Sequence, residues 1–217
     1  MGTLWLRWVG VNVVGEIVGF GLAGTLMMLS GEAITSQDGL PQLILGGVAV
    51  IAVGLLEGTS VGLAQWTVLR TMFPSISALA WLAATIAGAI VAWGAGMAIG
   101  VLAGDALAAD DVDMPIAGAL VIGAIAGAIL AAPQWTALRR AGIEAPWWIP
   151  AHAFAWSVGM VVAFAGVAAL PSSAAITFTV IAMAGTGLGM GVLVAATTGL
   201  ALVDAARPRP SRSPARP

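Results

Sequence analysis

Hydrophobic residues form six long stretches along this chain, and short polar segments separate them. The stretches cover approximately residues 8–29, 42–66, 79–103, 115–137, 148–170 and 176–203. Each is long enough to cross a bilayer as an α-helix, which takes about 20 residues. None alternates polar and apolar positions as a membrane β-strand does. Because backbone groups inside hydrocarbon must bond within their own segment, the pattern predicts an all-α integral membrane protein with six transmembrane helices.

The charged residues predict how these helices are oriented. With six crossings, all eight basic residues fall on one side of the membrane: Arg7, Arg70, Arg139, Arg140, Arg207, Arg209, Arg212 and Arg216. The first and third loops carry the acids Glu32, Asp38, Asp105, Asp110, Asp111 and Asp113. The positive-inside rule then places both termini in the cytoplasm of a bacterial inner membrane.

The composition favours lipid as the main surroundings of the protein. Only 8% of the residues are charged, whereas soluble domains carry about a quarter. The chain has no cysteine, which excludes disulfides, thiolate metal sites, palmitoylation and a catalytic thiol. We therefore expect membrane lipids as partners and no nucleic acid. We also expect the first stretch to be retained, because it is too long for a signal-peptide core and contains Glu16.

An internal repeat divides the six stretches into three helix pairs. The segment QWTVLR at 65–70 recurs as QWTALR at 134–139, an offset of 69 (134 − 65). Aligning Trp8, Trp81 and Trp148, which begin three similar stretches, brings Gly15, Gly88 and Ala155 into register. The predicted pairs are 5–72, 78–142 and 146–206 in one domain, followed by a disordered, Arg/Pro-rich cytoplasmic tail at 207–217. In the third pair Thr198, Gly199 and Val203 replace the Gln, Trp and Arg of the motif.

The repeated residues have an architectural interpretation. Tryptophan rings anchor helices at the membrane interface, and arginines extend to the headgroups. The predicted anchors are Trp8, Trp66, Trp81, Trp135, Trp148, Arg70, Arg139 and Arg140. Small residues four apart permit close helix contact, and they occur at Gly88, Ala92, Gly96, Gly100 and Gly104, and at Ala119, Gly123, Gly127 and Ala131.

Helices that begin with tryptophan alternate in this chain with Gly-rich helices that end in QWxxLR. This pattern resembles a group of uncharacterised polytopic membrane proteins from bacteria, cyanobacteria among them. The resemblance covers most of residues 5–203. It implies a fold style and no activity.

Two ionisable residues lie inside the predicted spans, where such residues are costly and often functional. Glu16 lies eight residues after Trp8, and Glu57 lies thirteen residues before Arg70, about 12 Å and 20 Å along their helices. The repeat places Ala89 and Trp156 at the position of Glu16, and Ala126 and Met190 at that of Glu57. The acids are therefore unique to the first pair, although protonated carboxyls bonded to a neighbouring helix remain an alternative to a transport role.

A second polar set follows the repeat. The alignment superposes Asn12, Thr85 and His152, and it likewise superposes Gln65, Gln134 and Thr198. These six residues could form a polar ring at the cytoplasmic mouth of the bundle, or they could serve only as hydrogen bonds between helices. His152 is the only histidine and makes a poor metal site by itself.

No catalytic or cofactor motif emerges, so we expect neither an enzyme nor a bound cofactor or metal. The acids at 105–113 lack the spacing and glycine of a calcium loop, which favours a solvated outer loop. The chain carries no phosphate-binding loop, Ser/His/Asp set, HExxH or dinucleotide fingerprint.

Two functions stay open. One is a small transporter or channel-like protein for a small solute, proton or cation, with Glu16 and Glu57 in the pathway. The other is a non-catalytic accessory subunit, or a lipid- or pigment-binding scaffold, of a larger membrane complex. A homo-oligomer is compatible with either.

Overall fold

The computed structural model describes residues 1–108, 116–171 and 173–207, with side chains in the third helix up to Ile99. Six helices and no strand make up this part of the chain. They are α1 (Gly2–Thr35), α2 (Leu40–Met72), α3 (Ala78–Ala108), α4 (Ile116–Arg140), α5 (Trp148–Ala168) and α6 (Ile176–Ala205). All six are long and apolar enough to cross a membrane, which confirms the predicted helices. The acidic outer loop was predicted at 105–113, but residues 105–108 belong to α3. The rest of that loop lies outside the described residues, as does the predicted tail beyond Arg207.

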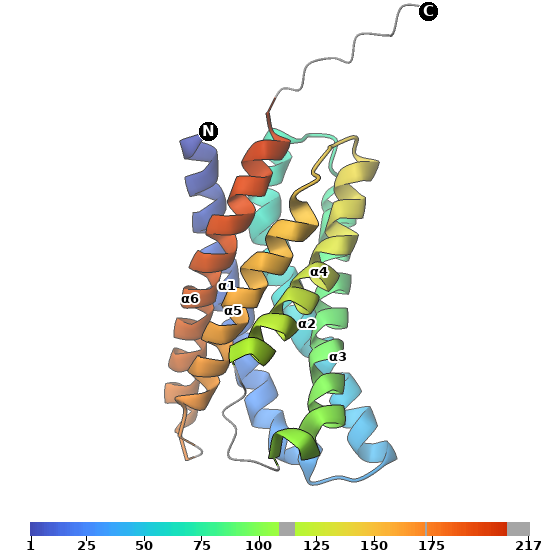
Figure 1. The fold of residues 1–217 in the computed structure, drawn as a ribbon, viewed down its shortest axis with the longest axis vertical. Helices are drawn as coiled ribbons and strands as arrows, with labels where there is room; N and C mark the ends of the chain where they lie inside the picture. Colours follow the sequence, from blue (N-terminus) through green and yellow to red (C-terminus); the bar gives the residue numbers. More distant parts are fainter. Residues whose placement is uncertain (109–115, 172, 208–217) are drawn as a thin grey trace, which may run out of the picture.

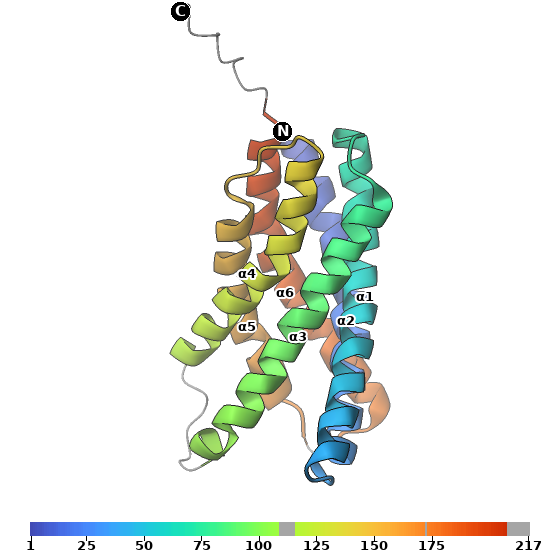
Figure 2. The same cartoon turned by 90° about the vertical axis from the view of Figure 1, so that its right-hand side faces the viewer.

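The contacts between helices close the bundle into a ring, which Figure 1 shows from the side. Each helix packs against its neighbours in sequence, and α6 packs against α1. Within the described residues the backbones of helices that are not ring neighbours do not come close together, and such helices meet only through side chains in the interior. Figure 2 gives the view after a quarter turn, with the start of α1 and the end of α6 at one end, which we call the terminal end. The α2–α3 and α4–α5 connections lie there too.

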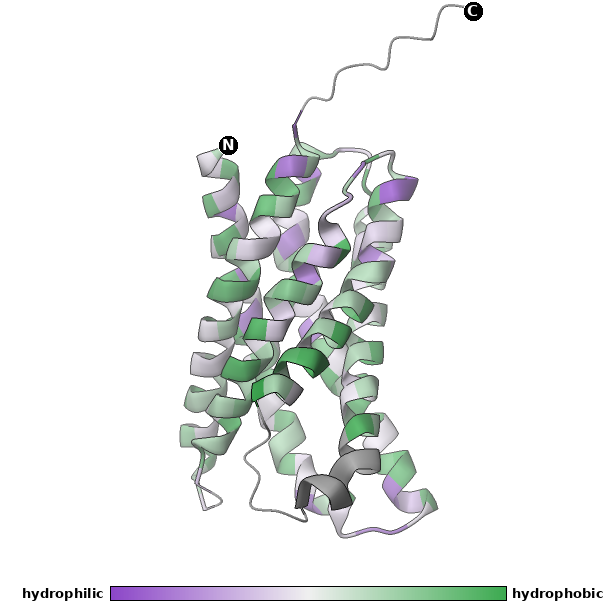
Figure 3. Ribbon diagram, viewed as in Figure 1, coloured by the Kyte–Doolittle hydropathy of each residue, from purple (hydrophilic) through white to green (hydrophobic). Residues whose placement is uncertain are grey.

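The outward and inward faces of the ring have opposite chemistry. Large apolar side chains point outward on every helix, as in α2, where Leu43, Val48 and Ile51 are at least half exposed. Figure 3 shows hydrophilic residues gathered at the helix ends and at interior positions. Apart from Thr25 and Thr179, the buried polar side chains are Asn12, Glu16, Glu57, Gln65, Thr85, Gln134, His152, Thr186 and Thr198. A protein in water would place these groups the other way round.

Glycines four residues apart bring three of the helix contacts close together. Gly54 and Gly58 in α2 face the backbone of α3, and a Cβ atom at Gly54 would lie 2.6 Å from the Cα of Ile90. Similar glycines of α4 face α5, and those of α6 face α1, at Gly123, Gly127, Gly187 and Gly191. No larger residue fits at such distances without moving a helix.

The small-residue stripe predicted for α4 is confirmed, because Ala119, Gly123, Gly127 and Ala131 are all buried. The stripe predicted for α3 holds only in part. Gly88 lies against the backbone of Leu130, whereas Gly96 has open space beside it. Pro133 lies inside α4, and the helix changes direction along its length (Figure 2), as an internal proline explains.

Candidate functional site

Three tryptophans fill the interior of the ring at the terminal end. Trp8, Trp81 and Trp148 are fully buried. The ring of Trp148 meets the other two edge to face, with centroids 5.8 Å from Trp8 and 5.9 Å from Trp81. We call these three residues the tryptophan triad. They belong to an apolar cluster that also includes Leu69, Leu138 and Leu202.

The triad corrects the sequence prediction for these three residues. We expected Trp8, Trp81 and Trp148 to anchor the helices among lipid headgroups. An anchoring ring has to reach the outer surface, but each of these lies on the inward face of α1, α3 or α5. Their role is therefore to fill the interior.

The other two predicted anchors, Trp66 and Trp135, are partly exposed and pack against the apolar cluster that includes the triad. Trp66 Nε1 is buried without a partner. The guanidinium of Arg70 lies 5.0 Å from the ring centroid of Trp66, and that of Arg139 lies 4.6 Å from the ring centroid of Trp135. Both are cation–π contacts across one helical turn. This geometry suits interfacial anchoring, which stays a prediction for these residues and for the exposed Arg140.

Three hydrogen bonds of the same kind connect the triad to polar residues one helical turn further along α1, α3 and α5. The Asn12 amide donates to the Trp8 carbonyl at 2.8 Å, and the Thr85 hydroxyl donates to the Trp81 carbonyl at 3.0 Å. His152 Nδ1 lies 2.8 Å from the Trp148 carbonyl. Because a carbonyl oxygen only accepts, this nitrogen carries the proton, and in the neutral ring Nε2 is an acceptor.

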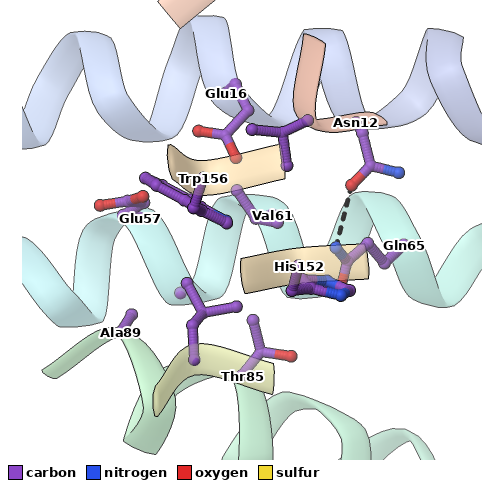
Figure 4. A pocket seen from close by; sticks show the side chains of 12 residues that line it. Asn12, Glu16, Glu57, Val61, Gln65, Thr85, Ala89, His152 and Trp156 are labelled. Carbon is purple, nitrogen blue, oxygen red and sulfur yellow. Dashed lines mark hydrogen bonds between the residues drawn. The ribbon is translucent and has the colours of Figure 1, made fainter. Parts of the chain in front are cut away.

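Two glutamines connect these residues across the interior. Gln65 Nε2 donates to Asn12 Oδ1 at 2.9 Å (Figure 4). Gln134 Nε2 donates to Gln65 Oε1 at 3.2 Å and to Thr85 Oγ1 at 3.0 Å. The polar residues that the sequence grouped therefore lie together. With Thr198 and His152 they form what we call the polar layer.

The triad is also hydrogen-bonded to the polar layer. Trp148 Nε1 donates to Gln134 Oε1 at 3.2 Å, and Trp8 Nε1 donates to Thr198 Oγ1 at 3.0 Å. Trp81 Nε1 is buried without a partner. In both bonds a tryptophan of an odd-numbered helix reaches a polar residue of the even-numbered helix before it in the ring.

The two acids, Glu16 and Glu57, lie further from the terminal end than the polar layer does. Glu16 follows Asn12 by one helical turn, and Glu57 precedes Gln65 by about two turns. Both are buried, each with 3% exposure, and both line one cavity (Figure 4). The space open to the centre of a water molecule is about 10 Å³, which is close to the minimum for one water. The other polar residues around this acid cavity are Asn12, Gln65, Thr85 and His152.

The two carboxyl groups differ in their partners. Glu57 Oε2 accepts a hydrogen bond from Trp93 Nε1. Glu16 Oε2 is buried with no partner. Beside them α1 and α2 come close, since a Cβ atom at Gly19 would lie 3.1 Å from the Cα of Glu57. The two acids are thus held on facing helices while one carboxyl oxygen stays unsatisfied.

An apolar cluster lies on the side of the cavity away from the triad. Phe20 and Trp93 stack there with centroids 6.3 Å apart. The buried members of the cluster are Phe20, Leu130, Ala155, Trp156, Ala163, Met183, Met190 and Val194. The acid cavity therefore lies between the polar layer, on the side of the triad, and this apolar cluster.

The described residues offer no multi-ligand metal site, since nowhere do three His, Cys, Asp or Glu side chains converge. Comparison with family models, curated proteins and solved structures finds no match. The resemblance to bacterial QWxxLR proteins therefore stays a prediction from sequence.

Two features of the site were missed in the sequence. Nothing in the apolar stretch around Trp93 indicated that it would donate to Glu57. The other feature is the glycine contacts of α2 and α6, since only those of α4 were predicted. They did leave a signal, because in every helix pair two glycines precede Gln65, Gln134 or Thr198 by 11 and 7 residues.

Proposed function

We propose that the protein is a six-pass inner-membrane transporter that moves a proton or small cation through the interior of its helix ring. The pathway includes Glu16 and Glu57. The apolar outer face supports membrane insertion. Arg70, Arg139 and Arg140 lie in the last turns of α2 and α4 at the terminal end, which supports cytoplasmic termini.

We also propose that the ring consists of three repeated helix pairs. The hydrogen bond to a tryptophan carbonyl has the same form in α1, α3 and α5. The close glycine contacts fall at equivalent positions of α2, α4 and α6. Against this background the acids stand out, because only the first pair carries them.

The observation that carries the transport proposal is the acid cavity. Two carboxyl groups in a membrane interior are costly, and Glu16 Oε2 has no hydrogen bond to offset that cost. A purely structural carboxyl would be expected to satisfy its oxygens within the protein. The small size of the cavity is compatible with an occluded state, which a transporter passes through between its two open states.

One observation favours the second candidate, a non-conducting scaffold subunit. The tryptophan triad fills the interior at the terminal end, so this conformation has no open path there. A scaffold needs no such path, whereas a transporter has to move the triad during its cycle.

Flux through reconstituted vesicles separates the two candidates. Vesicles that hold wild-type protein should dissipate a pH gradient faster than protein-free vesicles. Glu16→Gln and Glu57→Gln should each slow this at least about tenfold, the scale expected when an essential proton-transfer group is removed. Glu32→Gln is the matched control, since Glu32 lies on the same helix but is exposed, and it should leave the rate unchanged.

Two outcomes would contradict the transport proposal. One is a wild-type rate equal to that of empty vesicles for protons and for sodium, potassium and ammonium ions. The other is equal loss of flux in all three variants. Co-purification of a stoichiometric protein or pigment after mild extraction would then support the scaffold.

A further inference from the structure

We infer that Glu16 and Glu57 hold one exchangeable proton between them, beside a single water molecule, so that the acid cavity takes a proton rather than a metal ion or an organic solute. This rests on the proposed transport function and names the substrate of the same site. The size of the cavity, its hydrogen-bonding groups and its charge each support it.

Size limits the occupant first. The cavity has room for about one water-sized sphere. Glycine contacts fix the surrounding backbones, as at Gly19 beside Glu57 and Gly191 beside Glu16. An organic solute with several heavy atoms does not fit the enclosed conformation.

The hydrogen-bonding groups around the cavity leave an excess of acceptors. The Thr85 hydroxyl and the His152 Nδ1–H both donate to backbone carbonyls, and Gln134 uses its amide on Gln65 and Thr85. Asn12 and Gln65 have each committed one of two N–H groups. The groups left as acceptors are the Glu16 carboxyl, the second oxygen of Glu57 and His152 Nε2. A proton on the carboxyl pair turns one of these acceptors into a donor.

Charge gives the same answer. The titratable groups lining the cavity are Glu16 from α1, Glu57 from α2 and His152 from α5. The lining residues of α3, α4 and α6 are Thr85, Ala89, Leu130 and Val194, none of which titrates. With no lysine or arginine in this lining, two ionised carboxylates would repel each other at low dielectric. One retained proton removes that repulsion, and the carboxyls then titrate as a pair.

A metal ion fits this set less well. Hard cations such as Ca²⁺ and Mg²⁺ need about six oxygen ligands. The nearby amide oxygens already accept N–H donors, at Asn12 Oδ1 from Gln65 and at Gln65 Oε1 from Gln134. Coordination would require these bonds to break.

Infrared difference spectroscopy on the purified full-length protein tests the proposal without any flux. Wild-type protein should show a carboxylic acid C=O band that titrates with pH and shifts in D₂O, with an amplitude of about one proton per chain. Glu16→Gln and Glu57→Gln should each remove or shift this band, and Glu32→Gln should preserve it. Comparing sodium with choline chloride at constant pH and ionic strength should leave the wild-type band unchanged.

Two results would overturn the inference: a wild-type spectrum with no titrating band that depends on Glu16 and Glu57, or loss of the band when sodium replaces choline. The salt comparison uses only wild-type protein, so it decides the question even if a variant does not fold. A titrating band without proton flux would refute the transport proposal and leave the shared proton standing. Sodium flux without a titrating band would refute the inference and leave transport standing.

Discussion

The polar layer and the two acids Glu16 and Glu57 border the same cavity, yet their hydrogen bonding differs. In the polar layer one hydrogen bond recurs on three helices, and Gln134 alone takes part in three bonds. In the acid cavity Glu57 has a single donor, Trp93, and one oxygen of Glu16 has none.

This difference indicates which buried polar residues stabilise the ring and which do not. A buried group whose hydrogen bonds are satisfied stabilises the fold, and its removal leaves several partners unpaired. A buried carboxyl with an unsatisfied oxygen costs stability. The following substitutions test that contrast, from the largest expected effect to the smallest.

Replacing Trp148 should have the largest effect, because its ring contacts both other members of the triad. Trp148→Ala should lower the free energy of unfolding by about 4 kcal/mol, since it opens a cavity in the core. The adjacent Trp147 is 61% exposed, against 0% for Trp148, and Trp147→Ala should cost far less. Denaturant titration in detergent micelles measures both, and equal losses would show that the triad is not a core.

Gln134→Leu tests the polar layer directly. It removes the hydrogen bonds that Gln134 makes with Gln65, Thr85 and Trp148. Gln65 keeps its bond to Asn12 and Thr85 keeps its bond to the Trp81 carbonyl, whereas Trp148 Nε1 loses its one partner. We expect a loss of about 2 kcal/mol, from three bonds that are each worth a little under 1 kcal/mol in a membrane protein. Gln37→Leu is the control, because Gln37 is exposed between α1 and α2, and its stability should stay close to wild type.

Glu16→Leu is the counterpart in the acid cavity. The substitution replaces an unsatisfied buried carboxyl with an apolar group of similar size. The same titration should therefore give a free energy of unfolding equal to wild type or up to about 1 kcal/mol higher. A loss as large as that of Gln134→Leu would erase the distinction between the two regions.

A single hydrogen bond distinguishes two equally buried tryptophans, Trp8 and Trp81. Trp8→Phe removes the N–H that donates to Thr198 at 3.0 Å, whereas Trp81→Phe removes an N–H with no partner. Both changes shrink the same triad, so the lost ring area should largely cancel in the comparison. Trp8→Phe should be the less stable variant by about 1 kcal/mol, as thermal melting of the two purified variants would reveal.

The helices and the inward polar positions could be predicted because both depend on local patterns. A run of about 20 apolar residues has few other structures available to it, and a polar residue inside such a run tends to face the protein. Glu16, Glu57 and the residues of the polar layer were therefore found from the sequence.

The roles of the tryptophans could not be predicted in the same way. A tryptophan at the end of an apolar stretch looks the same whether it faces headgroups or the ring interior. Only the closed ring separates Trp148 from Trp135. The bond from Trp93 to Glu57 joins residues 36 apart in sequence, and it depends on how α2 and α3 are rotated against each other. The glycine spacing, by contrast, was readable and marks the even-numbered helices.

The contact between α6 and α1 has a consequence for how the chain is connected. Glycines of α6 meet the backbone of α1 much as those of α2 meet α3 and those of α4 meet α5. The contact between the last helix and the first is thus of the same kind as the α2–α3 and α4–α5 contacts. Its closure depends on the packed faces and not on the loop order, so a circular permutant, or three separate two-helix chains, could form the same ring.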